Sequence, residues 1–162
     1  MDNTLEGRKI LLLSSNFGTE TDEIRSPLGA LREAGATVTV AAPETGVVKT
    51  LELDREPGPE VPVDATHDSV KAADFDALVL PGGTLNADAL RADETAQFLA
   101  RAFAADGKPV AAICHAPWLL VETGLADGRE LTSVPTIRTD LVNAGGRWAD
   151  EEVVVDDSAG FR

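Results

Sequence analysis

Hydrophobic and polar positions alternate along this chain in a way that predicts strands and helices in turn. Four short apolar runs have few polar interruptions, which is typical of strands covered on both faces of a parallel sheet. These runs are residues 8–14, 36–42, 76–80 and 110–113. A shorter strand is expected over 131–134, and a final pair of strands around Trp148 and residues 153–155.

Helical spacing of apolar residues appears between these runs. Helices are expected over 27–34, 93–105, 117–123 and 139–143. Ser26 and Pro27 form a helix-start signal, with a capping hydroxyl followed by proline at the first helical position. Phe98 and Phe103 belong to the predicted inner stripe of the second helix. Gly124 is placed to end the third.

The segment from 43 to 63 interrupts this alternation. It contains four of the nine prolines and two glycines, and it lacks a helical period. This composition predicts a β-hairpin followed by an extended loop. At about 20 residues the segment is long for a connection without structure, so a function or a subunit contact is plausible there. Residues 15–22 are expected to form a loop, and 68–73 a short helical turn.

Strands alternating with helices predict one α/β domain over residues 1–162, with a mostly parallel sheet and helices on both faces. Ligands of such sheets bind beyond the carboxyl ends of the strands. Three features fall at that edge: the loop after Ser14, the Gly82-Gly83 turn, and the Cys114-His115 pair. We therefore expect one site built from three segments that are distant in the sequence.

The formal charge of −14 narrows the range of partners. Nucleic acids and anionic membranes are polyanions and would repel such a surface, so neither is expected as a partner. The single cysteine excludes an internal disulfide and fits a reducing compartment. No long apolar segment and no signal-like start are present, so the expected location is the cytoplasm.

Cys114 stands between an apolar strand and a helix that starts at Pro117. A strand that turns directly into a helix raises the residue at the bend above the sheet, as in a nucleophile elbow. The helix dipole and the neighbouring His115 would both favour the thiolate, so we expect a thiol that ionises easily. The alternative is that Cys114 is a small buried hydrophobic residue without chemistry. His67 is interpreted as a surface residue.

Three segments resemble the PfpI/ThiJ family, and in particular its PfpI/YhbO-type branch. They are residues 75–83, 107–120 and 142–156, and the likeness extends over nearly the whole chain. The resemblance implies a flavodoxin-like three-layer sandwich related to class I glutamine amidotransferase domains. Relatives usually continue through a further strand and a final helix, and we expect either that this protein lacks them or that the sequence is shortened.

The resemblance also implies roles for individual residues. Cys114 would be the nucleophile and His115 the general base. Glu23 would be a protonated carboxyl beside the thiol, with Glu20 as the fallback. Asp88 would reach His115 from a neighbouring subunit, which requires a dimer or a hexamer.

The N–H groups of Gly83 and His115 would form the oxyanion hole. Ala116 replaces the glycine that usually follows Cys-His, and its methyl group could crowd the substrate or alter the start of the helix. No metal or cofactor is expected, because one cysteine and two separated histidines give no ligand spacing.

The function that these features favour is a cysteine-nucleophile hydrolase or a glyoxalase III-like or deglycase-like stress enzyme. Its substrate would be a small carbonyl compound or an adduct of one. Two alternatives stay open: an intracellular cysteine peptidase of the PfpI type acting on peptides, and a redox-sensing or chaperone-like stress protein in which Cys114 is oxidised.

Overall fold

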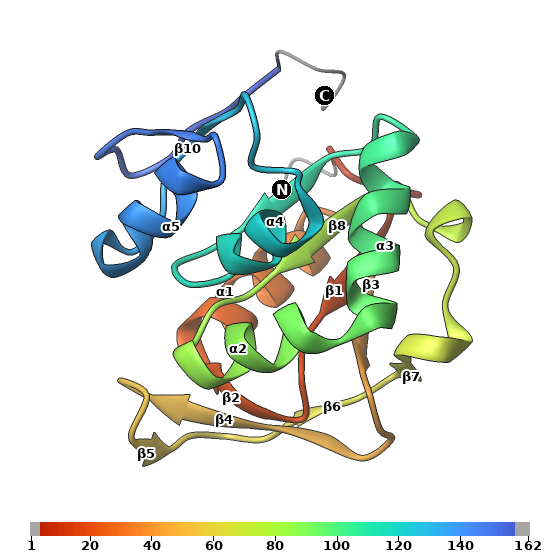
Figure 1. Cartoon of the computed structure of the whole chain (residues 1–162). Helices are drawn as coiled ribbons and strands as arrows, with labels where there is room; N and C mark the ends of the chain where they lie inside the picture. The colour runs from red at the N-terminus through yellow and green to blue at the C-terminus, as the bar shows by residue number, and fades with distance from the viewer. Residues whose placement is uncertain (1–3, 158–162) are drawn as a thin grey trace.

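A five-stranded parallel sheet forms the centre of the molecule, in the order β7-β3-β1-β8-β9 (Figure 1). The structure, a computed structural model, describes residues 4–157. The strands of this sheet are β1 (Lys9–Leu13), β3 (Thr37–Ala42), β7 (Ala65–Thr66), β8 (Ala77–Leu80) and β9 (Val110–Ala112). The four predicted strands are thus confirmed as neighbours in one sheet, and β1 lies at its middle.

The alternation of side chains along β1 divides the core into two layers. Leu11 and Leu13 belong to one buried cluster, and Ile10 and Leu12 to the other. All four are nearly inaccessible to solvent. Because successive strand residues point to opposite faces, both faces of the sheet must be covered.

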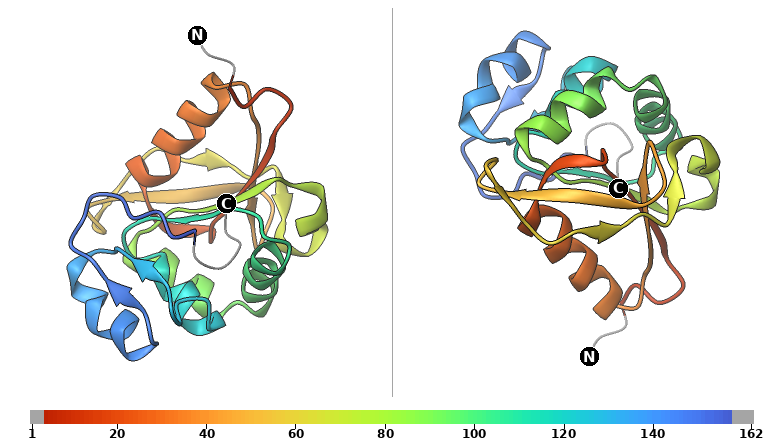
Figure 2. Two further views of the ribbon diagram at one scale, coloured as in Figure 1. Left: turned by 90° about the horizontal axis from the view of Figure 1, so that it is seen from above. Right: turned by 90° about the horizontal axis from the view of Figure 1, so that it is seen from below.

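Helices supply that cover on both faces (Figure 2). They are α1 (Thr21–Glu33), α2 (Thr84–Ala92), α3 (Glu94–Ala105), α4 (Pro117–Thr123) and α5 (Arg138–Asn143). Ile24 and Leu28 of α1 pack into the cluster of Ile10, while α3 and α4 pack into that of Leu11. The arrangement confirms the flavodoxin-like α/β fold. No helix among the described residues is both long and apolar enough to cross a membrane.

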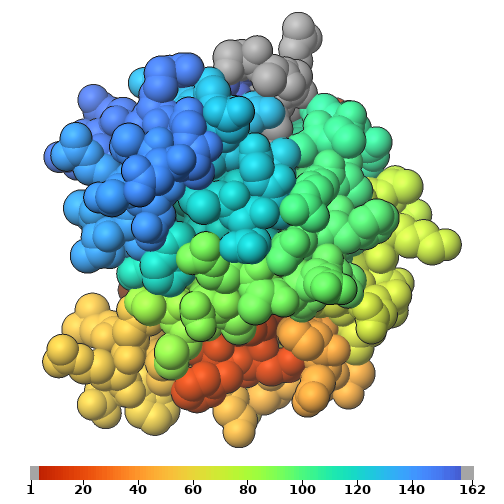
Figure 3. Space-filling model, viewed as in Figure 1, coloured from red at the N-terminus to blue at the C-terminus, as the bar shows by residue number. Residues whose placement is uncertain are grey.

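The proline-rich segment forms a small second sheet against the loop after β1. Its strands are β4 (Val47–Glu52), β5 (Glu56–Pro57) and β6 (Val61–Pro62), which pair antiparallel to one another through β4. The predicted hairpin is therefore confirmed. The loop expected over 15–22 is wrong, because β2 (Phe17–Glu20) pairs with β4 and α1 begins directly afterwards. Figure 3 shows α2 packed directly onto β2.

The predicted start of the first helix at Ser26 is also wrong, because α1 begins at Thr21 and Pro27 lies inside it. Proline has no N–H, so the carbonyl of Glu23, four residues earlier, receives no hydrogen bond from Pro27. Asp22 and Glu23 occupy the first turn, where the helix dipole favours acidic groups.

Sequence patterns missed α2, which follows the Gly82-Gly83 turn at once. Its buried residues Asn86, Ala87 and Leu90 have the spacing of one helix face, but two of them are too small or too polar to stand out. On α3 the prediction for Phe98 is wrong: its side chain is 68% exposed, and the inner stripe consists of Ala96, Leu99, Ala100 and Phe103.

The carboxyl-terminal part forms a separate two-stranded unit of β10 (Glu130–Leu131) and β11 (Arg147–Trp148), which pair in parallel. The prediction of a strand over 153–155 is wrong. Val153 and Val155 are 74% and 78% exposed, and within residues 4–157 the segment pairs with no strand. β-branched residues favour strands only when a neighbouring strand or a core accepts them.

His67 is buried rather than exposed, which corrects the sequence-based interpretation. It begins the 3-10 turn η1 (His67–Ser69), which is followed by η2 (Ala72–Asp74). Its Nδ1 lies 2.7 Å from Asp93 Oδ2, and its Nε2 lies 3.0 Å from the carbonyl oxygen of Ser14. The imidazole therefore ties η1 to the end of β1 and to the start of α3.

Asp93→Ala is expected to destabilise the fold by about 3 kcal/mol, because two kinds of contact are lost together. Asp93 caps α3 by accepting from the N–H groups of Thr95 and Ala96, and it also pairs with the buried His67. Urea unfolding measures this loss. Asp68→Ala is the matched control, since the one hydrogen bond of its exposed carboxylate within residues 4–157 comes from the Thr95 hydroxyl. Equal stability of the two variants would contradict the structural role of His67.

Candidate active site

Cys114 occupies a sharp bend between β9 and α4, as the sequence predicts. Its φ is 59°, a left-handed conformation that is uncommon for a residue with a side chain. α4 begins at Pro117 and ends at Thr123, and the φ of 76° at Gly124 gives the expected left-handed end. The half-buried thiol is therefore held above the carboxyl end of the sheet. The predicted bend between the strand and the helix is confirmed.

The Gly82-Gly83 turn at the end of β8 brings Glu23 and Cys114 together. A Cβ on Gly82 would collide with Glu23 Oε2, with the carbonyl oxygen of Ile113 and with Cys114 Cβ. Only glycine therefore allows the carboxyl, the turn and the thiol to approach so closely. The three segments that were expected to meet at this edge of the sheet do so.

Backbone N–H groups surround the sulfur atom. Those of Gly83 and His115 are positioned to hydrogen-bond Cys114 Sγ, and both act to stabilise the thiolate. Gly83 has a φ of 90°, and an added Cβ would strike the backbone of β2 between Gly18 and Glu20. The turn thus presents its N–H to the thiol only because no side chain blocks its approach.

His115 contacts the thiol directly. Its Nδ1 lies 3.3 Å from Cys114 Sγ, and its Nε2 lies 3.3 Å from the hydroxyl of Thr84. The Thr84 hydroxyl donates in turn to Asp54 Oδ2 at 2.8 Å. The ring of Trp118 lies at 5.5 Å between centroids and limits the room in which the imidazole can turn. A base within reach of a thiol is the geometry that nucleophilic catalysis requires.

Glu23 lies in the first turn of α1 beside the thiol. Burial raises its pKa above the ordinary 4.5, and the contacts with the Cys114 thiol and the Gly82 N–H partly oppose this. Glu20 and Asp54 add their negative charges and raise it further. Within the described residues, Oε2 of Glu23 is buried without a hydrogen-bond partner of ordinary geometry. Burial without a hydrogen-bond partner favours the protonated form of the Glu23 carboxyl, which can donate its proton.

The expectation of an easily ionised thiol needs correction. Burial raises the pKa of Cys114 to about 12, and the charge and hydrogen bond of Glu23 add to the rise, while the N–H groups of His115 and Gly83 oppose it. The negative charge of Glu23 opposes the thiolate of Cys114, so a proton on Glu23 favours ionisation of the thiol.

The fallback residue Glu20 has a different task. It ends β2, and its carboxylate accepts hydrogen bonds from the backbone N–H groups of Leu53 and Asp54. Asp88 is exposed on α2, and no hydrogen bond or ion pair of its side chain occurs within residues 4–157. Its contact with His115 of another subunit stays a prediction.

Sequence reasoning missed three polar residues that build the site: Asp54, Thr84 and Asn86. Asn86 is fully buried, donates from Nδ2 to the carbonyl oxygens of Pro81 and Gly82, and accepts from the N–H of Ser15 at 2.7 Å. It therefore fixes the glycine turn to the loop after β1. The signal available in the sequence was that polar residues, Thr84 and Asn86, follow the Gly82-Gly83 turn closely.

The methyl group of Ala116 faces the hydrophobic core and not the thiol of Cys114. Ala116 is 2% exposed, has ordinary helical angles and packs into the core cluster of Leu11. Replacing glycine by alanine at this position therefore adds core contact and leaves the start of α4 regular.

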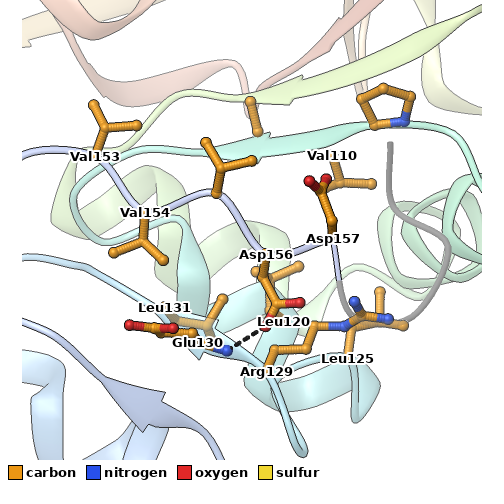
Figure 4. Close-up of a pocket in the computed structure, with 13 residues that line it drawn as sticks. Val110, Leu120, Leu125, Arg129, Glu130, Leu131, Val153, Val154, Asp156 and Asp157 are labelled. Atoms are coloured by element: carbon orange, nitrogen blue, oxygen red, sulfur yellow. Dashed lines mark hydrogen bonds between the residues drawn. The ribbon is translucent and has the colours of Figure 1, made fainter.

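Two cavities border the outer edge of β9. One of about 340 Å³ lies between β9, α4 and residues 153–157, where Asp156 accepts from the N–H of Glu130 (Figure 4). Cys114 does not line it. The second, of about 530 Å³, is mostly apolar and has Cys114 and Pro117 in its wall. A volume of this order suits a small molecule.

Nowhere in residues 4–157 do three or more His, Cys, Asp or Glu side chains gather in a way that could hold a metal ion. The model of the DJ-1/PfpI family matches residues 8–159.

Three similar proteins extend the comparison. Deglycase PfpI of Pyrococcus furiosus is 45% identical over 91% of this chain and 85% of its own length. Putative cysteine protease YraA of Bacillus subtilis is 43% identical over 90% and 82%. The crystal structure of Drosophila melanogaster DJ-1beta has a TM-score of 0.81 at 34% identity, covering 94% of this chain and 78% of that one. The chain belongs to the DJ-1/PfpI family.

Proposed function

We propose that this protein is a cysteine-dependent enzyme that converts small α-oxoaldehydes, such as methylglyoxal, and releases their adducts from amines and thiols. The observation that supports this is the placement of Cys114 on a strand-to-helix bend between a carboxyl and an imidazole. The thiol, an acid and a base then meet at one carbonyl-sized position.

The first step would be addition of Cys114 to the aldehyde. The S–C bond forms, the π electrons of the carbonyl move to its oxygen, and the thiol proton goes to His115 Nδ1, which lies 3.3 Å away. The N–H groups of Gly83 and His115 would receive the new oxyanion, and Glu23 would supply its proton. The product of this step is a hemithioacetal.

The second step would move hydrogen within the bound substrate. His115 would first return the proton it took from the thiol to the Glu23 carboxylate by way of solvent, which makes the imidazole neutral again. It would then remove the proton from C1 of the hemithioacetal, while the C2 oxygen gains a proton, and the product is an enediol. A proton added to C2 and the loss of the proton of the C1 hydroxyl convert the enediol into an alcohol and a thioester. Water then cleaves the thioester and restores the thiol. The sum is methylglyoxal plus water to lactate, with no external oxidant or reductant.

Adducts would enter the same sequence after losing their amine or thiol. The relatives named deglycases support this extension. The name of YraA favours a second candidate, a peptidase that uses the same nucleophile on an amide. A reducing cytoplasm would keep Cys114 free in either case. A homo-oligomer in which Asp88 approaches a neighbour's site belongs to the proposal as well.

The test is to incubate the purified protein with methylglyoxal in D₂O and to follow the products by NMR. The proposal predicts lactate with deuterium at C2, because His115 exchanges its proton with solvent between removal and return. Parallel incubations with a methylglyoxal-modified peptide and with casein separate adduct release from peptidase action. Casein cleavage without consumption of methylglyoxal would replace the proposal with the peptidase.

A further inference from the structure

A chain of side-chain contacts leads away from the thiol, through His115, into the hairpin that precedes β5. His115 Nε2 lies 3.3 Å from Thr84 Oγ1, and Thr84 Oγ1 lies 2.8 Å from Asp54 Oδ2. The N–H of Thr84 also donates to Asp54 Oδ1 at 2.9 Å. The carboxylate of Asp54 therefore holds both polar groups of Thr84, at the amino end of α2.

The directions of these hydrogen bonds are fixed by what each group can donate. A carboxylate only accepts, so the Thr84 hydroxyl must use its one hydrogen on Asp54. Its oxygen is then left with lone pairs toward His115, and only an N–H on Nε2 can complete that contact. A neutral imidazole that carries its hydrogen on Nε2 has a free lone pair on Nδ1.

We propose that Asp54 and Thr84 are positioning residues that fix the tautomer of His115, so that Nδ1 faces Cys114 as a base. The Nδ1 lone pair then points to the sulfur at 3.3 Å. The carboxylate that orients the imidazole through Thr84 belongs to the same chain as His115. The catalytic role of Asp54 and Thr84 rests on the proposed function. The tautomer of His115 follows from the hydrogen bonds alone and does not depend on that function.

The hairpin holds Asp54 in place at a cost in backbone strain. Leu53 and Asp54 have φ values of 54° and 56°, in the left-handed region that residues with side chains adopt rarely. Glu20 stabilises this turn by accepting from both of their N–H groups. Leu53 is 85% exposed, so packing in the hydrophobic core does not stabilise this strained conformation. Strain of this kind concentrates at functional sites.

The tautomer can be observed directly. The chain has two histidines, so long-range ¹H–¹⁵N spectra contain two imidazole patterns, and His115→Gln identifies that of His115. The proposal predicts the Nε2–H pattern in the wild type. Thr84→Val keeps the shape and the backbone N–H but removes the hydroxyl, so a mixture of tautomers is expected. Thr84→Ser should restore the wild-type pattern.

Kinetic measurements follow the consequence for the thiol. Thr84→Val is expected to lower kcat for methylglyoxal about 10- to 100-fold with little change in KM, and Thr84→Ser to recover most of the loss. The rate of Cys114 alkylation by iodoacetamide at pH 7 should fall in parallel. Asp54→Asn should resemble Thr84→Val, because an amide can donate to the Thr84 oxygen. Glu56→Gln removes an exposed acid of the same hairpin and should match the wild type.

Alkylation and spectra need no substrate, so they separate the two proposals. Absence of methylglyoxal turnover, together with an Nε2–H pattern that depends on Thr84, would end the proposed function and leave the positioning role intact. An Nδ1–H pattern in the wild type would overturn the positioning role. So would a spectrum and an alkylation rate that Thr84→Val leaves unaltered, or a spectrum that responds to Asp88→Asn and not to Asp54→Asn.

Discussion

Cys114→Ser is expected to lower the turnover of methylglyoxal by about 1,000-fold or more, which is the largest effect predicted for any single substitution in this chain. A serine hydroxyl fits the same bend and the same contacts, but at neutral pH it is a far weaker nucleophile than a thiolate. The measurement is lactate formation under saturating substrate.

Cys114→Ala serves as the matched control, because it removes the nucleophile without offering a substitute. Both variants should unfold at nearly the wild-type urea concentration, since the thiol is only half-buried. Turnover by the serine variant at a rate close to that of the wild type would show that sulfur takes no part in the reaction.

Glu23→Gln is expected to lower turnover about 100-fold while making the protein more stable at pH 8 by about 1 kcal/mol. Activity falls because the amide cannot deliver an acidic proton. Stability rises because the buried Oε2 has no hydrogen-bond partner of ordinary geometry among the described residues, and the amide carries no charge that must be desolvated.

The pH dependence of this gain follows from the direction of the shift. Burial raises the pKa of Glu23 in the folded protein above 4.5, so the unfolded chain releases the proton at a lower pH than the folded one. The wild type therefore loses stability as the pH rises through the folded value, and the glutamine variant does not. At pH 4 the two should be equally stable.

Urea unfolding at pH 4 and pH 8 measures the difference. Asp22→Asn is the control, because it removes the same charge from the same helical turn at an exposed position, and it should show no gain at pH 8. A glutamine variant less stable than the wild type at pH 8 would mean that the carboxylate of Glu23 is well satisfied when ionised.

The sequence predicted the sheet well because its three central strands, β3, β1 and β8, are buried on both faces, whereas the edge strand β9 is partly exposed. Uninterrupted apolar runs such as those around Leu11 and Leu78 have few other structural explanations. The bend at Cys114 was likewise predictable. An apolar strand is followed directly by Cys114 and His115, and Pro117 then starts a helix two residues after His115. In these segments, local pattern and tertiary structure agree.

The errors arose where tertiary contacts override local signals. Ser26-Pro27 is a strong helix start, yet the pairing of β2 with β4 sets the beginning of α1 earlier, at Thr21. His67 looked like a surface residue because its partner, Asp93, lies 26 positions away. The run of three valines from Val153 to Val155 has the composition of a strand, but among the described residues it pairs with no other strand.

Only some of the residues of the candidate site could be predicted from the sequence. Cys114, His115 and Glu23 could be named, because they lie in recognisable segments. Asp54 and Thr84 could not, because their significance depends on the fold of a proline-rich hairpin over the start of α2. The pKa of the thiol was misjudged for a related reason: the helix dipole and the imidazole are local features, whereas burial and the charge of Glu23 come from the fold.

Titration of the single cysteine tests the central claim most directly. The protein contains one cysteine, so iodoacetamide can label one thiol per chain, and intact mass gives the labelled fraction. If Cys114 is the nucleophile, methylglyoxal turnover falls in proportion to that fraction and reaches zero at one label per chain. Turnover that persists in fully labelled protein would contradict this account.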